Sequence, residues 1–192
     1  MGMTHIISPK VNNRQKDFII GTILGGSSIV KPSKGKNCYL SMRSKNIEWL
    51  RFKATELVHL ASNAPITKEK TNRWHSICYP IFNEFREMFY DNRGRRRLHL
   101  DNLSLLRDMA LAVWFGDCGT FSRGHAIINT HIWKKKGTET IHEYFTCLSF
   151  DSSIIKQRNN YRIKLDQHSS ESLWRLIGPH MPTFMPFASH QR

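Results

Sequence analysis

The feature that most constrains the fold is a repeated order of elements: helix, strands, helix, strands and helix occur twice, over about 90 residues each. In the first copy we expect helices over residues 17–27, 46–62 and 81–89, and strands over 28–30, 37–43 and 73–78. In the second copy we expect helices over 105–119, 138–150 and 170–177, and strands over 126–133 and 161–165. Basic turns stand at 92–97 and 134–137. The repeat is one of elements rather than of identical residues, and it indicates an internal duplication.

Local patterns support these assignments. Cys38, Leu40 and Met42 alternate with polar residues, which is the period-2 pattern of a strand with one solvated face. Asn46 is a favourable N-cap for a helix whose apolar residues follow at helical spacing. Residues 17–27 form a short apolar helix with several glycines, and such a helix can pack closely against another helix, because glycine lets backbones approach.

The chain is strongly basic. It has 29 Lys and Arg against 15 Asp and Glu in 192 residues, a net charge of +14 and a pI near 10.0. Residues 1–46 contain eight Lys and Arg but only one acid, Asp17. This excess indicates a polyanionic partner, most commonly nucleic acid and less commonly a membrane surface. No apolar run approaches the roughly 18 residues that a membrane span needs, so no membrane association is expected.

Several common site types are absent from the sequence. The four cysteines, Cys38, Cys78, Cys118 and Cys147, form no Cys-x-x-Cys pair, and no His-Glu-x-x-His pattern occurs. We therefore expect reduced thiols rather than a zinc ribbon or a disulfide framework. The polar, basic residues 1–16 lack the apolar stretch of a secretory signal, which fits a cytoplasmic protein or one made inside an organelle.

Two glycine-containing helices carry a resemblance to a known family. Residues 19–27, IIGTILGGS, resemble the first motif of single-chain LAGLIDADG homing endonucleases, and residues 111–119, LAVWFGDCG, resemble the second. The two motifs stand 92 residues apart, from Gly26 to Cys118, in the expected order of elements. The similarity extends over residues 15–188.

The resemblance implies an α+β fold of two pseudo-symmetric αββαββα halves, an N-terminal half over 15–98 and a C-terminal half over 99–188. The two motif helices would pack side by side through small residues, Gly21, Gly25, Ala112 and Gly116. Two antiparallel sheets would form a saddle over a nucleic-acid duplex. Because both halves lie in one chain, we expect a monomer.

Solvated strand positions and basic turns supply the candidate contacts to bases and phosphates. They are Lys31, Lys34, Lys36, Tyr39, Ser41, Arg43, Arg73, His75, Arg95, Arg96, Arg97, Asn129, His131, Lys134, Lys135, Lys136, Arg162 and Lys164. Aromatic residues beside basic ones, Trp74, Trp133 and Tyr161, either stack on unpaired bases or belong to the core.

The family's metal-binding acids have no counterparts. Each motif helix of the family ends in a carboxylate that binds divalent metal for phosphodiester cleavage. Here the two positions are Gly26, which has no ligand atom, and Cys118, a soft ligand poorly suited to Mg²⁺. Asp117 is adjacent to the second position, but neighbours on a helix point about 100° apart. We therefore expect no metal, no cofactor and no intact catalytic residue.

Three functions remain open from the sequence. The first is a cleavage-inactive protein bound to structured RNA, either an intron maturase or a subunit of a ribonucleoprotein such as an organellar ribosome. The second is an active Mg²⁺-dependent DNA endonuclease in which Asp117 serves as the metal ligand. The third is a sequence-specific DNA-binding protein without cleavage. The first is preferred, with a mitochondrial or chloroplast location expected and a cytoplasmic one as the alternative.

Overall fold

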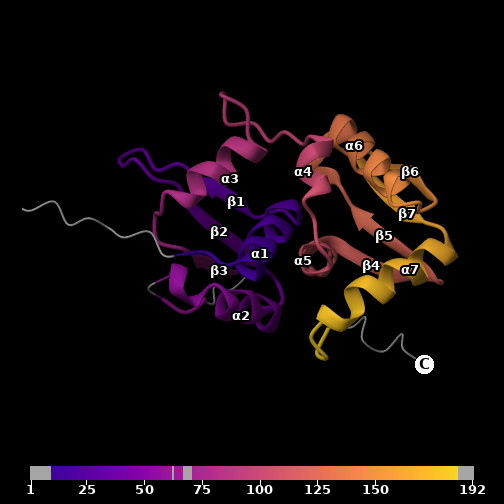
Figure 1. Ribbon diagram of the computed structural model, residues 1–192, viewed down its shortest axis with the longest axis horizontal. Coiled ribbons are helices and arrows are strands. Elements are labelled where there is room, and N and C mark those ends of the chain that lie inside the picture. Colours follow the sequence, from indigo (N-terminus) through magenta and orange to yellow (C-terminus); the bar gives the residue numbers. More distant parts are fainter. Residues whose placement is uncertain (1–9, 62, 67–70, 186–192) are drawn as a thin grey trace, which may run out of the picture.

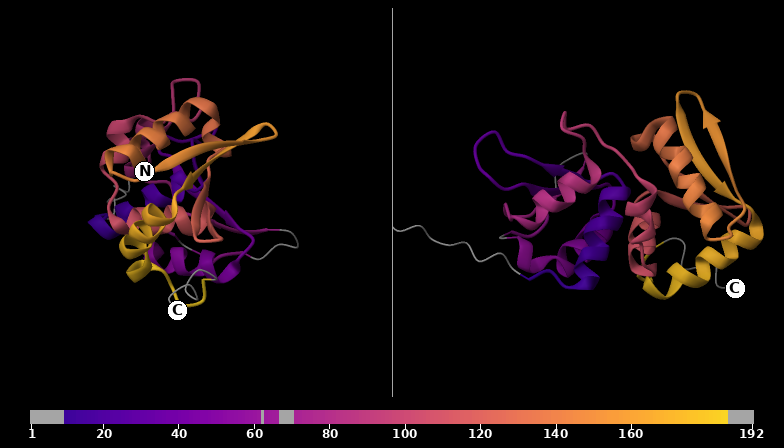
Figure 2. Two further views of the ribbon diagram at one scale, coloured as in Figure 1. Left: turned by 90° about the vertical axis from the view of Figure 1, so that its right-hand side faces the viewer. Right: turned by 45° about the horizontal axis from the view of Figure 1, so that its top comes forward.

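A computed structural model describes residues 10–61, 63–66 and 71–185. Two antiparallel sheets lie on either side of a central pair of helices, α1 and α5, and further helices cover one face of each sheet (Figure 1). Each sheet with its helices derives from one half of the chain, which gives the molecule the expected two-part form (Figure 2).

The first part contains α1 (Asn13–Leu24), β1 (Ser28–Val30), β2 (Tyr39–Ser44), α2 (Ile47–Glu56), β3 (Asn72–His75) and α3 (Ile81–Phe89). The strands pair antiparallel in the order β1-β2-β3. Ile66 forms an isolated antiparallel bridge with Arg73 beyond the edge of this sheet. Asn46 caps α2 as predicted, because its Oδ1 accepts from the backbone N–H groups of Glu48 and Trp49.

The second part contains α4 (Leu100–Ser104), α5 (Asp108–Cys118), β4 (Gly119–Ser122), β5 (His125–Asn129), α6 (Lys134–Cys147), β6 (Ser152–Gln157), β7 (Asn160–Leu165) and α7 (Gln167–Ile177). Its strands pair in the order β4-β5-β7-β6. From α5 onward this is the complete αββαββα order. Helix α7 lies on the side of the buried strand residues, since Ser170 Oγ accepts from the backbone N–H of Ala126 in β5.

Helices α1 and α5 are held together by very close packing. Gly21 leaves no room for a side chain: a Cβ there would lie 2.4 Å from the carbonyl oxygen of Ala110 and 2.8 Å from Val113 Cβ. Near the start of both helices, Arg107 donates to Asp17 Oδ1 from Nε at 3.0 Å. Burial raises the pKa of Asp17, although the Arg107 guanidinium opposes that rise. The interface between α1 and α5 is thus closely packed at Gly21 and carries an ion pair near the start of both helices.

The α+β class and the two antiparallel sheets agree with the sequence prediction, but several details differ. Among the described residues the first part has three strands rather than the four of the expected αββαββα half, with only the isolated bridge of Ile66 beyond β3. Strands β4 and β6 were not predicted, and β5 ends at Asn129, before a short 3₁₀ helix over His131–Trp133. The predicted basic turn 134–137 is wrong, because these residues form the first turn of α6. Residues 186–188, the end of the predicted C-terminal half, lie outside the described residues.

We predict that Gly21→Ala destabilises the protein despite the better helix propensity of alanine. The new methyl group would overlap the α5 backbone, and overpacking of this kind typically costs about 1–3 kcal/mol, more than the roughly 1 kcal/mol gained in propensity. Urea unfolding followed by circular dichroism measures the change. Lys16→Ala, at an exposed position of α1, is the control and should stay within about 0.5 kcal/mol of wild type. Equal stability of wild type and Gly21→Ala would contradict the packing.

Candidate nucleic-acid interface and central cleft

Each sheet exposes the face that is not covered by its helices. Alternation and register place Tyr39, Ser41 and Arg43 of β2 on one such face, beside Arg73 and His75 of β3. Ser41, which was predicted to be solvated, is buried at this position. The corresponding face of the second sheet carries the side chains opposite to the buried Ala126, Ile128, Ile163 and Leu165, namely Ile127, Asn129, Arg162 and Lys164. We call these two sets the sheet faces. They combine cationic, amide and hydroxyl groups, which are suited to phosphate and base edges.

On the first sheet face, the charges of the arginines act on the neighbouring histidine. Arg43 pairs in register with Arg73, and His75 packs edge-on against Tyr39 with ring centroids 5.8 Å apart. Partial desolvation lowers the pKa of His75, and the charges of Arg43 and Arg73 lower it further. The imidazole is therefore mainly neutral at pH 7, where it can donate and accept hydrogen bonds.

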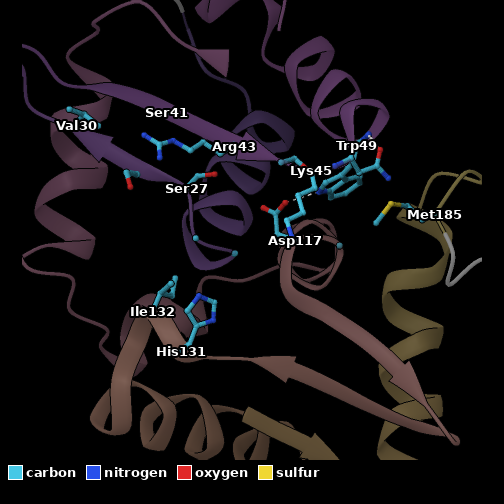
Figure 3. A pocket seen from close by; sticks show the side chains of 16 residues that line it. Ser27, Val30, Ser41, Arg43, Lys45, Trp49, Asp117, His131, Ile132 and Met185 are labelled. Atoms are coloured by element: carbon cyan, nitrogen blue, oxygen red, sulfur yellow. Dashed lines mark hydrogen bonds between the residues drawn. The ribbon is translucent and has the colours of Figure 1, made fainter. Parts of the chain in front are cut away.

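A cavity of about 710 Å³ separates the ends of the two motif helices from the first sheet (Figure 3). Its lining brings together Gly26 after α1, Asp117 in α5, Arg43 in β2 and Trp49 in α2. His131, from the 3₁₀ helix that follows β5, lines the same cavity rather than a strand face. Of the two metal-ligand positions inferred from the motifs, Gly26 lines this central cleft, whereas Cys118 follows the lining residue Asp117 and is not part of the lining.

Neither of those two positions supplies an oxygen ligand. Gly26 adopts φ +118°, and a Cβ built there would meet open space. At the second position, Cys118 Sγ donates to the carbonyl oxygen of Trp114 at 3.3 Å within α5. Burial raises the pKa of the Cys118 thiol, and the neighbouring Asp117 raises it further. Cys118 is therefore protonated at neutral pH, and a thiol is not a ligand for a hard divalent cation.

Asp117 is the only carboxylate next to these positions in the motif, and its side chain is bound by other side chains of the protein. Its Oδ1 accepts from Lys53 Nζ at 2.6 Å and from Trp49 Nε1 at 2.6 Å. Lys53 is fully buried, and the Asp117 side chain is 8% exposed. The other oxygen, Oδ2, is buried, has no hydrogen-bond partner among the described residues, and lies against Gly25, where an added Cβ would be 2.6 Å from it. We call Asp117, Lys53 and Trp49 the buried triad.

These residues do not fit the divalent metal that the motifs imply. An ion near the ends of the motif helices would find no side-chain oxygen at Gly26, a protonated thiol at Cys118 and, at Asp117, a carboxylate already neutralised by a buried ammonium group. Across residues 10–61, 63–66 and 71–185, no group of three or more His, Cys, Asp and Glu side chains is placed to hold a metal ion.

The predicted basic turn after α3 is only partly available to a ligand. The Arg96 guanidinium donates to the carbonyl oxygens of Ile23, Gly26 and Ser27 after α1, and stacks over Tyr90 and Trp133. It therefore satisfies carbonyl groups that the end of a helix leaves unpaired. Arg95 pairs with Asp91, and Arg97 donates to the carbonyl oxygen of Glu87, but both side chains remain exposed.

The remaining predicted cations are exposed. Lys31, Lys34 and Lys36 lie in the loop between β1 and β2, and Lys134, Lys135 and Lys136 lie at the start of α6, where Lys135 pairs with Glu139 at 3.7 Å. Two of the aromatic candidates belong to the core: Trp74 and Trp133 are buried, and Trp133 Nε1 donates to the carbonyl oxygen of Leu24. Tyr161 is half-buried in β7.

Sequence reasoning missed Lys53 and Trp49. A signal was present, since Lys53 stands between Leu50 and Leu57 on the apolar stripe of its helix, where a charged residue needs a buried partner. The identity of that partner could not be read from the sequence, because Asp117 is 64 residues away along the chain.

Two motif helices packed between two antiparallel sheets are the arrangement of a homing-endonuclease-like fold built from two halves. The sequence matches the LAGLIDADG DNA endonuclease family over residues 16–173, and the chain belongs to that family. No curated protein matches the sequence. No helix in the described part of the chain has the length and apolarity required to cross a bilayer.

Solved structures share the fold. The homing endonuclease I-WcaI, bound to its DNA recognition sequence, matches with a TM-score of 0.86 and 19% identity, over 93% of this chain and 87% of that one. I-DmoI in complex with DNA and Mn matches with a TM-score of 0.57 and 12% identity, over 85% and 96% of the two chains. The DUF199/WhiA protein from Thermatoga maritima matches with a TM-score of 0.56 and 14% identity, over 88% of this chain and 57% of that one.

We predict strong energetic coupling within the buried triad. Lys53→Met leaves the Asp117 carboxylate buried without its counter-ion and should lower the free energy of unfolding by about 3–5 kcal/mol. Asp117→Asn removes the charge, so the double variant should be more stable than the sum of the two single changes predicts, by about 1–3 kcal/mol. Chemical denaturation of the four proteins completes this cycle. Additive effects would show that the two side chains do not form an ion pair.

We predict that the Cys118 thiol resists alkylation in the folded protein. Its raised pKa leaves little thiolate at pH 8, whereas Cys147 is exposed on α6 and should react readily. Mass spectrometry of peptides after brief iodoacetamide treatment compares the two sites in one sample. Modification of Cys118 as fast as Cys147 would show an accessible, ionised thiol at the end of α5.

Proposed function

We propose that this protein binds nucleic acid along its two sheet faces and does not cleave it by a metal-dependent reaction. The observation that carries the proposal is the buried triad. The one carboxylate near the metal positions is neutralised by Lys53, and neither Gly26 nor Cys118 can replace it. The binding surface remains: Arg43 and His75 are exposed on the first sheet face, and the protein carries a net charge of +14.

The partner we favour is structured RNA, with the protein acting as an intron maturase or as a subunit of a ribonucleoprotein in an organelle. The support is the combination of a retained basic scaffold with a lost cleavage site. A protein of this fold that no longer cleaves nucleic acid can still function by binding a folded nucleic acid and holding it in place. The positive charge alone suits RNA and duplex DNA equally.

DNA binding without cleavage is the second candidate. It is favoured by the likeness in fold to I-WcaI, whose structure holds its DNA recognition sequence, and by sheet faces suited to the major groove. Cleavage through Asp117 is less compatible with the structure, since the carboxylate would first have to leave Lys53 and Trp49.

We predict that the purified protein binds nucleic acid but does not nick or cut it in Mg²⁺ or Mn²⁺. Supercoiled plasmid and a structured RNA, each incubated with excess protein, should stay intact on gels. Discrete cleavage that Asp117→Asn abolishes would overturn the proposal in favour of an active endonuclease.

Competition binding across a salt series should separate RNA from duplex DNA and locate the surface. Arg43→Gln should weaken binding and make the slope of log K against log salt shallower by about 1. Arg175→Gln, an exposed change on α7 with the same charge difference, should leave the slope unchanged. Tighter binding of duplex DNA than of structured RNA would replace the RNA preference by the second candidate. Equal effects of the two variants would refute the sheet face as the binding surface.

A further inference from the structure

A second cluster of cations lies away from the sheet faces. It lines a cavity of about 410 Å³ between the β1–β2 loop, α3 and the turn that follows α3. Lys31 and Lys36 come from the loop, Arg86 from α3, and Arg97 from the turn. The cavity lies on the helix side of the first sheet, because it is also lined by Cys38, which belongs to the core as Leu40 and Met42 do.

The two arginines are fixed in place while retaining free donors. Arg86 donates from one terminal nitrogen to the carbonyl oxygen of Ile29 at 2.8 Å, and its guanidinium stacks over the Tyr90 ring at 5.0 Å. Arg97 donates to the carbonyl oxygen of Glu87 at 2.6 Å. Both acceptors are neutral, so neither positive charge is neutralised there. A guanidinium has five N–H donors, which leaves several on each side chain for a ligand.

The positive charge of the cavity is in excess. Lys31 and Lys36 make no ion pair or hydrogen bond with any residue in the described parts of the chain. Of the two acids in the lining, Asp91 is already paired with Arg95 at 2.9 Å, which together with backbone N–H groups lowers the pKa of Asp91. The other acid, Glu87, is exposed. Arg86 and Lys31 also oppose the rise in the pKa of Cys38 that burial causes, which places both charges near that thiol.

We propose that this cavity is a phosphate-binding site that is separate from the sheet faces. Converging lysines and fixed guanidinium groups match the charge and the tetrahedral oxygens of a phosphate group. The phosphate belongs either to the backbone of a bound nucleic acid or to a free phosphate compound. The first source deepens the proposed function and rests on it: a folded RNA that fills the saddle would also reach the helix side of the first sheet.

The site itself is tested without any nucleic acid. Inorganic phosphate and tripolyphosphate are titrated into labelled protein while NMR follows the Arg86 Nε–H and the Cys38 backbone N–H. Lys31→Gln with Lys36→Gln should weaken the saturable shifts at least about tenfold, the effect of losing charge-assisted contacts. Lys16→Gln with Arg175→Gln, exposed positions outside both the cavity and the sheet faces, makes the same charge change and should bind as wild type does. Absent shifts in wild type, or equal weakening in both double variants, would overturn the site.

The source of the phosphate is tested with a structured RNA. If the backbone supplies it, RNA should displace tripolyphosphate, and Lys31→Gln with Lys36→Gln should make the salt slope shallower by about 1–2 while the control pair does not. RNA that binds without displacing tripolyphosphate supports the site with a free phosphate compound as its ligand. Saturable phosphate binding in a protein that binds no nucleic acid would likewise uphold the site, and would refute the proposed function alone.

Discussion

The close approach of α1 and α5 is the constraint on which the rest of the structure depends. Gly21 brings the backbones into contact, and Gly25 gives Asp117 a place against the end of α1. We call this interface between α1 and α5 the seam. At its other end, Arg107 donates to the Asp17 carboxylate. Helix α1 leads into β1 after three residues, and α5 leads into β4 without a loop, so the packing of the two helices also sets the spacing of the two sheets (Figure 1).

The proposed absence of metal-dependent cleavage depends on the contacts of Asp117 at the cleft. A divalent ion at such a seam requires exposed, ionised oxygen ligands from both helices. Here the carboxylate of Asp117 faces a buried lysine, so its charge stabilises the contact between α2 and α5 instead of binding a cation. Removing one member of such a pair destabilises the protein strongly, because the remaining charge stays buried. The same contact that supports the fold therefore makes Asp117 a poor substitute for the missing acids.

The sequence predicted the repeated organisation well, because apolar periodicity and the two glycine-containing helices are local signals. It missed β4, which follows α5 without a loop, and β6, an exposed strand with little alternation. For the site, the motifs identify Gly26 and Cys118 as the positions without oxygen-bearing side chains. The contacts of Arg96 and the partner of Asp117 could not be predicted from the sequence, because both depend on residues far apart in the chain that only the folded structure brings together.

Paramagnetic relaxation by Mn²⁺ tests the central claim most directly. In labelled protein with bound nucleic acid, an ion held at the seam would broaden the backbone N–H signals of Gly25, Gly26 and Gly116, which line the central cleft. The account predicts that these signals keep their intensity at Mn²⁺ concentrations that broaden exposed acidic positions such as Glu171. Selective, saturable broadening at the three glycines, removed by Asp117→Asn, would show that the seam still binds a divalent metal and would contradict the account.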